Sequence, residues 1–222
     1  MRTLLPEEIL SRRLGDAAEL REIHESKYPV SIRGFHSATD AMTGVHEIPL
    51  ADETDPPSVF TLTCEFATLD AQHRPLHGAT FLIDPNAGGD YPVSEPVARI
   101  ISKPVPFAPH IGLPSGAVCH GHFVWTPLRT PLSLYVAQLC RLLNYDEPAP
   151  DQSFSALNAA AVRHWATLGH QPLDPELGSP TASGLDSRTR VARPAAATAK
   201  RTMRRTDAST ASGSRRRMRR AS

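Results

Sequence analysis

Cys119 is the residue of this sequence whose surroundings best suit nucleophilic chemistry. It lies in a loop rich in proline and glycine, with His110, His120 and His122 close to it in the chain. A protonated imidazole beside a cysteine favours the thiolate, which is its reactive form. A thiolate exchanges acyl partners with other thiols with little further help. We therefore predict that Cys119 is a nucleophile that forms a thioester.

The other two cysteines are predicted to be structural. Cys64 falls on the inward positions of an alternating strand pattern, and Cys140 falls on the apolar stripe of a helix pattern. Most free cysteines in such positions are buried and inert. Three widely spaced cysteines, with no visible secretory signal before the first charges, indicate free thiols in a reducing cytoplasm.

The elements before the loop must position it. Residues 6–26 carry apolar side chains at steps of three and four, which predicts an amphipathic helix. Residues 59–66 alternate apolar and polar side chains, which predicts a strand with one buried face, and residues 79–83 predict another strand. Residues 84–130 hold 8 prolines and predict a long, ordered loop. The apolar positions of the helix are Leu10, Leu14, Ala17, Leu20 and Ile23.

Two helices are predicted after the loop. Thr130 is a suitable N-cap for the first, and Pro131 suits its first turn. Ser155 is a suitable N-cap for the second, and Gly169 is a suitable stop. The order of elements predicts an α+β domain with an N-terminal helix, an antiparallel β-meander, the Pro-rich loop and two C-terminal helices.

The charge distribution separates a body from a tail. Residues 1–185 hold 21 Asp and Glu against 12 Lys and Arg, whereas residues 186–222 hold 12 Lys and Arg against 2 Asp and Glu. We predict a domain over residues 1–177 and a disordered basic tail over residues 178–222. The tail has no aromatic residues for base stacking, so a nucleic-acid contact is expected only through its charge. No run of residues is long and apolar enough to predict a membrane span.

The residues around Cys119 resemble the ubiquitin-conjugating enzymes. Residues 91–96 (Tyr-Pro-Val-Ser-Glu-Pro) resemble a Tyr-Pro-x-x-Pro-Pro turn of that family, with Glu95 in place of one proline. Three further segments resemble family motifs: 108–111 (Ala-Pro-His-Ile) the His-Pro-Asn segment, 116–119 (Gly-Ala-Val-Cys) the Gly-x-Ile-Cys segment, and 125–127 (Trp-Thr-Pro) the Trp-Ser-Pro segment. Ala108 and His110 depart from the pattern. A form that diverges in this way resembles the bacterial members of the family, and the Arg-, Ala- and Pro-rich composition fits a GC-rich bacterial genome.

The resemblance implies a carrier that needs no cofactor. Cys119 would take a ubiquitin-like modifier from an activating enzyme and pass it to an amine on a target protein or small molecule. His110 would supply the hydrogen bond that the family's Asn supplies, and Trp125 would pack under the loop. Asp151, or else Asp146 or Glu147, would orient or deprotonate the amine. The activating enzyme would meet the helix face that carries Arg12, Arg13 and Arg21.

Three other interpretations use some of the same residues. A cysteine hydrolase would combine Cys119, His110 and either Asp146 or Asp151. A zinc site would use the thiol and imidazoles of residues 119–122, with His73 and His77 as additional ligands. A non-catalytic module that binds ubiquitin-like proteins would keep the fold without the chemistry.

Overall fold

The computed structural model describes residues 4–121, 123–146 and 156–178. The chain divides into two units, Met1–Thr189 and Arg190–Ser222, and every described residue belongs to the first. Apart from its first residue, the predicted tail lies outside the described residues, so the boundary at residue 177 stays a prediction.

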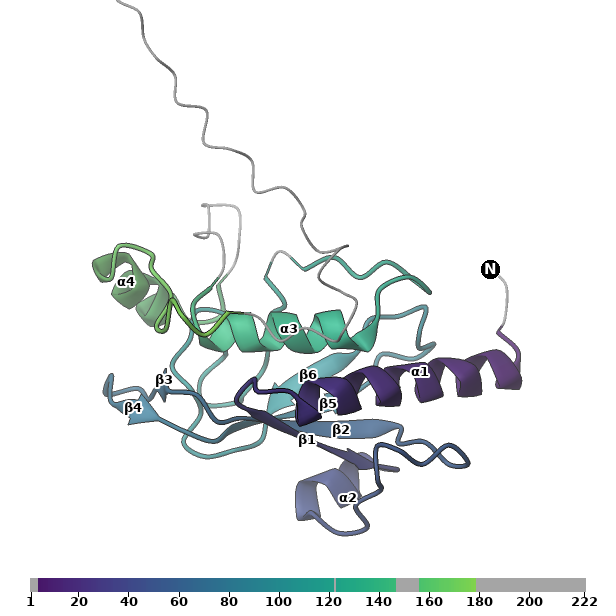
Figure 1. Cartoon of the computed structure of the whole chain (residues 1–222). Helices are drawn as coiled ribbons and strands as arrows, with labels where there is room; N and C mark the ends of the chain where they lie inside the picture. Colours follow the sequence, from purple (N-terminus) through teal and green to yellow (C-terminus); the bar gives the residue numbers. More distant parts are fainter. Residues whose placement is uncertain (1–3, 122, 147–155, 179–222) are drawn as a thin grey trace, which may run out of the picture. The chain divides into compact units, whose positions relative to one another are not determined.

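Four strands form one antiparallel sheet (Figure 1). They are β1 (Val30–Phe35), β2 (Val59–Cys64), β5 (Ala79–Asp84) and β6 (Val97–Ile100), in the order β1-β2-β5-β6. A separate two-stranded hairpin consists of β3 (Thr68–Leu69) and β4 (Pro75–Leu76). The sheet confirms the predicted antiparallel α+β class, but β6 was not predicted and lies within the segment expected to be an irregular loop.

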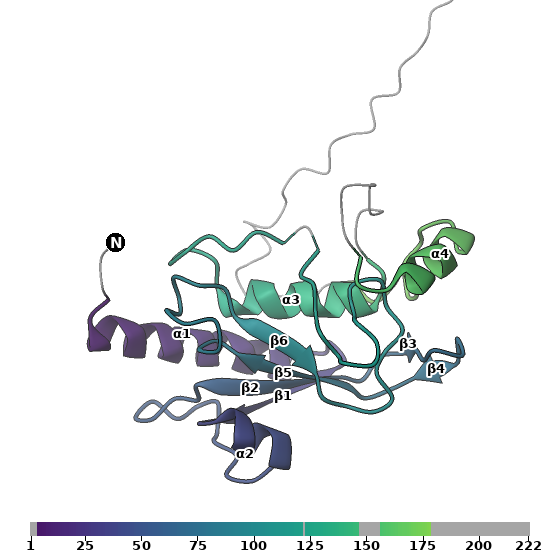
Figure 2. The same ribbon diagram turned by 180° about the vertical axis from the view of Figure 1, so that it is seen from behind.

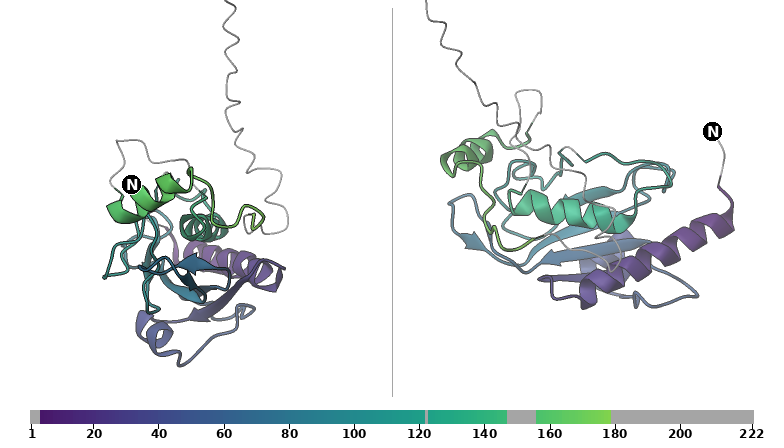
Figure 3. Two further views of the ribbon diagram at one scale, coloured as in Figure 1. Left: turned by 90° about the vertical axis from the view of Figure 1, so that its left-hand side faces the viewer. Right: turned by 45° about the horizontal axis from the view of Figure 1, so that its top comes forward.

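The helices cover both faces of the sheet. They are α1 (Pro6–Glu25), α2 (Ala38–Thr43), α3 (Leu132–Leu143) and α4 (Ala159–Thr167). Figures 1 and 3 show α1 and α3 on one face and the short α2 on the other. Figure 2 shows the connection from β6 to α3, which runs past the β6 edge and returns over α3. Within the described ranges, no helix has the length and apolarity that a membrane crossing requires.

The main core lies between the sheet and the pair α1 and α3. Both faces of β2 are buried. Phe60 and Leu62 face this core, whereas Val59 faces the smaller cluster under α2. The prediction of one buried face for β2 was therefore incomplete: burial of its second face depends on α2, which packs there. The central buried residues of the main core include Leu20, Ile23, Ile32, Leu62, Phe81, Ile83, Leu132, Tyr135 and Leu139.

The helix starts differ from the predicted ones. The N-cap of α3 is Pro131, without a side-chain cap, and the hydroxyl of Thr130 instead accepts the amide of Thr126 at 2.8 Å. The N-cap of α4 is Asn158, whose side chain accepts the amide of Ala161 at 3.1 Å. The predicted cap of this helix, Ser155, lies outside the described residues. The predicted caps, Thr130 and Ser155, stand one and three positions before the observed ones.

The first helix buries a shorter stripe than its pattern suggests. Ala17, Leu20 and Ile23 are buried, but Leu10 is 44% exposed. Figure 1 shows that the N-terminal part of α1 extends beyond the sheet, where no strand covers the helix. An apolar pattern defines the possible face of a helix, but its neighbours decide how much of that face is covered.

Candidate active site

Cys119 lies at the end of a hairpin that extends the sheet beyond β6. Its amide donates to the carbonyl of His110 at 2.9 Å, and the amide of Gly112 donates to the carbonyl of Ala117 at 2.8 Å. Ile111 pairs with Val118 between these two bonds. This register places His110 directly opposite Cys119, at a position where side chains of an antiparallel pair lie about 5 Å apart. The sequence neighbours predicted to act together are therefore brought together by backbone pairing.

The three cysteines have different environments. Cys64 and Cys140 are 0% exposed, and burial raises the pKa of Cys64 well above its ordinary value. Cys119 is partly exposed, and all three thiols are free. A macromolecular acyl group can reach only a thiol at the surface. The burial of Cys64 and Cys140 agrees with their predicted structural roles, and the partial exposure of Cys119 is what a nucleophile for a protein-sized acyl group requires.

Gly116 docks the hairpin on β6. The carbonyl of Gly116 accepts the amide of Ile100 at 2.8 Å, and Ala117 pairs with Arg99. Gly116 has a φ of +76°, and a Cβ added to it would lie 2.5 Å from the carbonyl oxygen of Ile100. A glycine is therefore required here both for its backbone conformation and for the close approach of the two segments.

We predict that Gly116→Ala lowers the free energy of unfolding by about 2 kcal/mol or more, since left-handed backbone and steric overlap both oppose alanine. Urea unfolding measures this change. Gly112→Ala in the same hairpin is the matched control: its Cβ would come no closer than 3.3 Å to any atom, and that atom is the hydroxyl of Ser115. Equal losses for the two variants would contradict the assigned role of Gly116.

Trp125 lies in the loop that follows the hairpin and packs against the turn at Tyr91 and against α3. Its indole nitrogen donates to the carbonyl of Pro92 at 3.1 Å, and its ring lies 5.8 Å from that of Tyr91 and 6.4 Å from that of Tyr135. The guanidinium of Arg12 lies over the rings of Tyr91 and Trp125, at 5.4 and 5.8 Å from their centroids. Cation–π contacts and the indole bond thus hold two loops together.

A buried ionic network anchors this loop to α1. Arg12 donates from Nε to both carboxylate oxygens of Asp16, at 3.0 and 2.9 Å. Arg12 also donates from Nη2 to the hydroxyl of Tyr91 at 3.1 Å and to the carbonyl of Thr130 at 2.7 Å. The Tyr91 hydroxyl donates to Asp16 at 2.5 Å. Asp16 is 4% exposed, and its burial raises its pKa against the opposing contacts with Arg12 and Tyr91.

This network corrects the predicted role of Arg12. The sequence places Arg12 with Arg13 and Arg21 on a polar helix face, but the side chain of Arg12 is only 18% exposed and faces inward. Asp16 also accepts the amide of Leu132 at 3.3 Å, so it caps the start of α3 from another helix. Neither the inward orientation of Arg12 nor the contact of Asp16 with Leu132 can be recognised from the neighbouring sequence. An acid and a base four residues apart suggest only an ordinary surface pair on a helix.

His120, the residue after Cys119, is held from two sides. Its Nε2 lies 2.6 Å from the hydroxyl of Tyr135, and its Nδ1 lies 3.3 Å from a carboxylate oxygen of Glu95. The carbonyl of His120 accepts the side-chain amide of Gln138 at 3.1 Å. Two contacts therefore fix this residue on α3, and a third joins it to the turn before β6. The sequence indicated only that His120 lies near the thiol.

The other predicted site residues differ in their burial, and some of them lie outside the described residues. The side chain of His110 is 3% exposed, and the carbonyl of Pro109 before it accepts the amide of Asn158 at 3.1 Å. Asp146, which follows α3, lies 3.6 Å from Nε of Arg141 and is 44% exposed. Asp151 and Glu147 lie outside the described residues, and so does His122. The catalytic roles of His110 and of the acidic residues stay predictions.

An open cavity of about 510 Å³ adjoins the network. It lies between the N-terminal half of α1 and the loop before α3. Charged side chains (Glu8, Arg12 and Glu19) and apolar ones (Leu128 and Pro131) both line it. In the described part of the chain, no group of three or more His, Cys, Asp or Glu is arranged to hold a metal ion.

Comparisons with known proteins add one finding. Neither a protein-family model nor a curated protein matches this sequence. Among solved structures, the chain is similar to the ubiquitin-conjugating enzyme E2 UbcA1 from Agrocybe aegerita, with 20% identity over 76% of this chain and 99% of that chain. The TM-score of this pair is 0.38.

Proposed function

We propose that the protein carries a ubiquitin-like modifier as a thioester on Cys119. The observation that carries this proposal is the placement of the thiols: Cys119 is partly exposed at the end of a braced hairpin, whereas Cys64 and Cys140 are fully buried. The motif resemblance in residues 91–127 points to the same thiol. A carrier needs a reachable sulfur at a fixed position, and little else for exchange between thiols.

The proposed reaction has two acyl transfers. The Cys119 thiolate attacks the thioester carbonyl of the modifier on the activating enzyme, a new C–S bond forms, and the activating enzyme's thiolate leaves. An amine nitrogen of the target then attacks the new thioester. An amide bond forms, the amine loses a proton to a base, and the Cys119 thiolate leaves. No oxidant, metal or cofactor takes part in either step.

Two groups are proposed to assist the second transfer. His110 is the proposed hydrogen-bond donor for the negative charge on the attacked carbonyl oxygen, because the hairpin register places it opposite Cys119. Such a donor contributes a few kcal/mol of transition-state stabilisation in comparable enzymes. Asp151 is the proposed acid that orients the amine, with Asp146 as the alternative.

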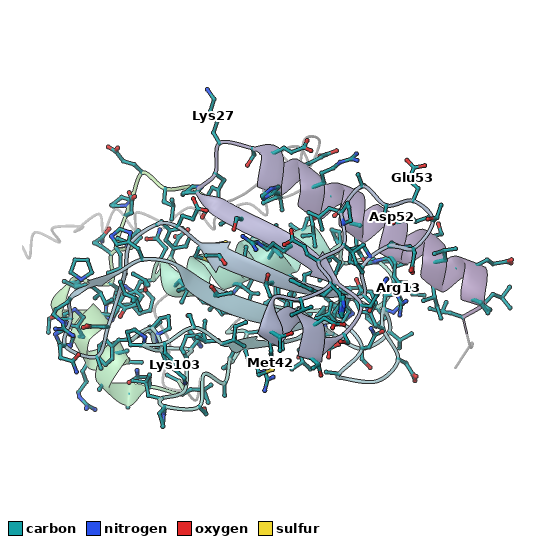
Figure 4. The ribbon with its side chains drawn as sticks, turned by 90° about the horizontal axis from the view of Figure 1, so that it is seen from below. Arg13, Lys27, Met42, Asp52, Glu53 and Lys103 are labelled. Atoms are coloured by element: carbon teal, nitrogen blue, oxygen red, sulfur yellow. The ribbon has the colours of Figure 1, made fainter. Side chains whose placement is uncertain are left out.

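The proposed partners are an activating enzyme, the modifier and an amine-bearing target. By resemblance, the activating enzyme would meet the polar face of α1, and the open cavity lies between α1 and the loop before α3. The charged and apolar side chains around this cavity suit a mixed protein contact. Two lysines of the described residues, Lys27 and Lys103, are exposed and could accept the modifier from a second copy (Figure 4).

The test is a non-reducing gel of the full chain incubated with candidate activating enzyme, modifier and ATP. The expected result is a band larger by one modifier that disappears on adding a thiol reductant. Absence of this band with active partners would overturn the carrier proposal. Hydrolysis of thioesters or peptides by Cys119 without any adduct would favour the cysteine hydrolase, for which the pairing of His110 with Cys119 is also suitable.

A further inference from the structure

One departure from the family-like motifs lies beside the residue that follows the candidate nucleophile. Glu95 stands where the resembling turn has proline, and His120 directly follows Cys119. Nδ1 of His120 lies 3.3 Å from the Glu95 carboxylate, and Nε2 lies 2.6 Å from the hydroxyl of Tyr135. The imidazole therefore joins a half-exposed carboxylate to a phenol that is 0% exposed.

The environment assigns the proton of this imidazole. Burial raises the pKa of Tyr135, so its hydroxyl stays protonated, and the backbone amide of Ala98 interacts with the same oxygen. The hydroxyl proton is thus available to Nε2 of His120. A neutral imidazole with its proton on Nδ1 then donates to Glu95 and accepts from Tyr135, which satisfies both ring nitrogens.

The imidazole is coupled to Cys119 through the backbone. The amide of Cys119 donates a hydrogen bond to the carbonyl of His110. The carbonyl of the next residue, His120, accepts a hydrogen bond from the side-chain amide of Gln138 in α3. The thiol-bearing residue is therefore held on one side by the hairpin and on the other by His120. If the ring contacts of His120 are lost, one of these two restraints weakens.

We propose that Glu95, His120 and Tyr135 form a brace that positions Cys119, and that protonation of His120 releases it, so that transfer from Cys119 slows in acid. The claim about transfer rests on the proposed function. The claim about position does not, because it concerns the backbone alone. His120 is a positioning residue in this scheme: it holds the segment and does not touch the acyl group.

The groups around the imidazole support the proposal that protonation of His120 weakens its contacts. A second ring proton would point at the Tyr135 hydroxyl, which can accept it only by turning its own proton away from His120, so the hydrogen bond that Tyr135 donates to the neutral ring would be lost. Burial lowers the pKa of His120, and the carboxylate of Glu95 opposes this shift. Glu95, from the turn before β6, and Tyr135, from α3, are the titratable side chains in contact with the ring among the described residues.

Three variants separate position from titration. His120→Gln keeps one donor and one acceptor but cannot titrate. His120→Ala removes the ring contacts, and Glu95→Gln removes the charge that favours the protonated ring. The first measurement is hydrogen exchange of the Cys119 amide by NMR, with the full chain and no partner. Dividing the wild-type protection by that of His120→Gln at each pH cancels the intrinsic pH dependence of exchange.

The expected ratio of protection is near one at pH 8 and falls about tenfold once the pH is low enough to protonate His120, below the ordinary histidine pKa of about 6.5, because local opening of the segment then becomes easier. His120→Ala should show low protection throughout, and Glu95→Gln should move the fall to lower pH. A ratio that does not change with pH, together with normal protection in His120→Ala, would overturn the brace. If His120→Ala does not fold, His120→Gln and Glu95→Gln still decide the question. If the protection ratio falls at the same pH in Glu95→Gln as in the wild type, the brace is also overturned.

The second measurement is discharge of a preformed Cys119 thioester to free lysine, again as the ratio of wild type to His120→Gln. A misplaced reacting group costs up to about a hundredfold in rate, so we expect His120→Ala to be slower by roughly tenfold to a hundredfold at pH 8. If the exchange results hold but no thioester forms under any condition, the proposed function fails and the brace stands. If thioester forms but exchange is unaffected by pH, only the brace fails.

Discussion

Cys119→Ala is expected to abolish the reductant-sensitive adduct with a ubiquitin-like modifier. Removing the nucleophile leaves only positioning, and comparable losses in other enzymes reach roughly three orders of magnitude or more. Cys119→Ser is expected to give a weaker adduct that resists thiol reductants and is cleaved by hydroxide, because an oxyester then replaces the thioester. Non-reducing gels with and without reductant, and with a brief alkaline treatment, distinguish these outcomes.

The matched controls are Cys64→Ala and Cys140→Ala. Both thiols are fully buried, so neither can reach a protein-sized acyl group without unfolding. These variants are expected to keep the adduct, with small losses of stability from the missing sulfur atoms. Retention of a reductant-sensitive adduct in Cys119→Ala, or its loss in a folded Cys140→Ala variant, would assign the chemistry to another thiol.

Asp16→Ala is expected to lower the free energy of unfolding by about 3–5 kcal/mol, since it leaves the guanidinium of Arg12 mostly buried without its carboxylate partner. The same change removes the hydrogen bonds from Tyr91 and from the amide of Leu132. Because the network joins α1, the turn at Tyr91 and the start of α3, the loop that carries Trp125 should also loosen. Urea unfolding measures the stability, and tryptophan fluorescence reports on the loop.

Arg13→Ala is the control for this prediction. Arg13, which follows Arg12 in α1, is labelled in Figure 4. Its hydrogen bond to Asn86, at 3.4 Å, is exposed. A loss within about 0.5 kcal/mol is expected for such a surface change. The double variant Arg12→Met/Asp16→Leu should recover part of the loss, because apolar side chains can replace a buried ion pair. A loss below about 1 kcal/mol for Asp16→Ala would show that the network contributes little.

The strands and helices with strong periodicity could be predicted from local patterns. The alternation in β2 and the three- and four-residue steps in α1 and α3 place apolar side chains on one face whatever the partner is. The boundaries were less predictable. Both Ser155 and Asn158 can cap a helix, and the choice of Asn158 coincides with a backbone bond from Asn158 to Pro109 in the site hairpin.

By itself, the sequence determined the class of fold, the order of most of its elements and the identity of the candidate nucleophile, because periodicity, turn residues and motif composition are local properties. Only the tertiary structure decided that β6 receives the hairpin, that Arg12 and Asp16 face inward, and that Glu95 meets His120. These features join residues more than 100 positions apart, such as Arg12 and Thr130, which are 118 positions apart, and Asp16 and Leu132, which are 116 apart. Contacts of this kind arise from the packing of elements against one another, which no short segment of the chain encodes.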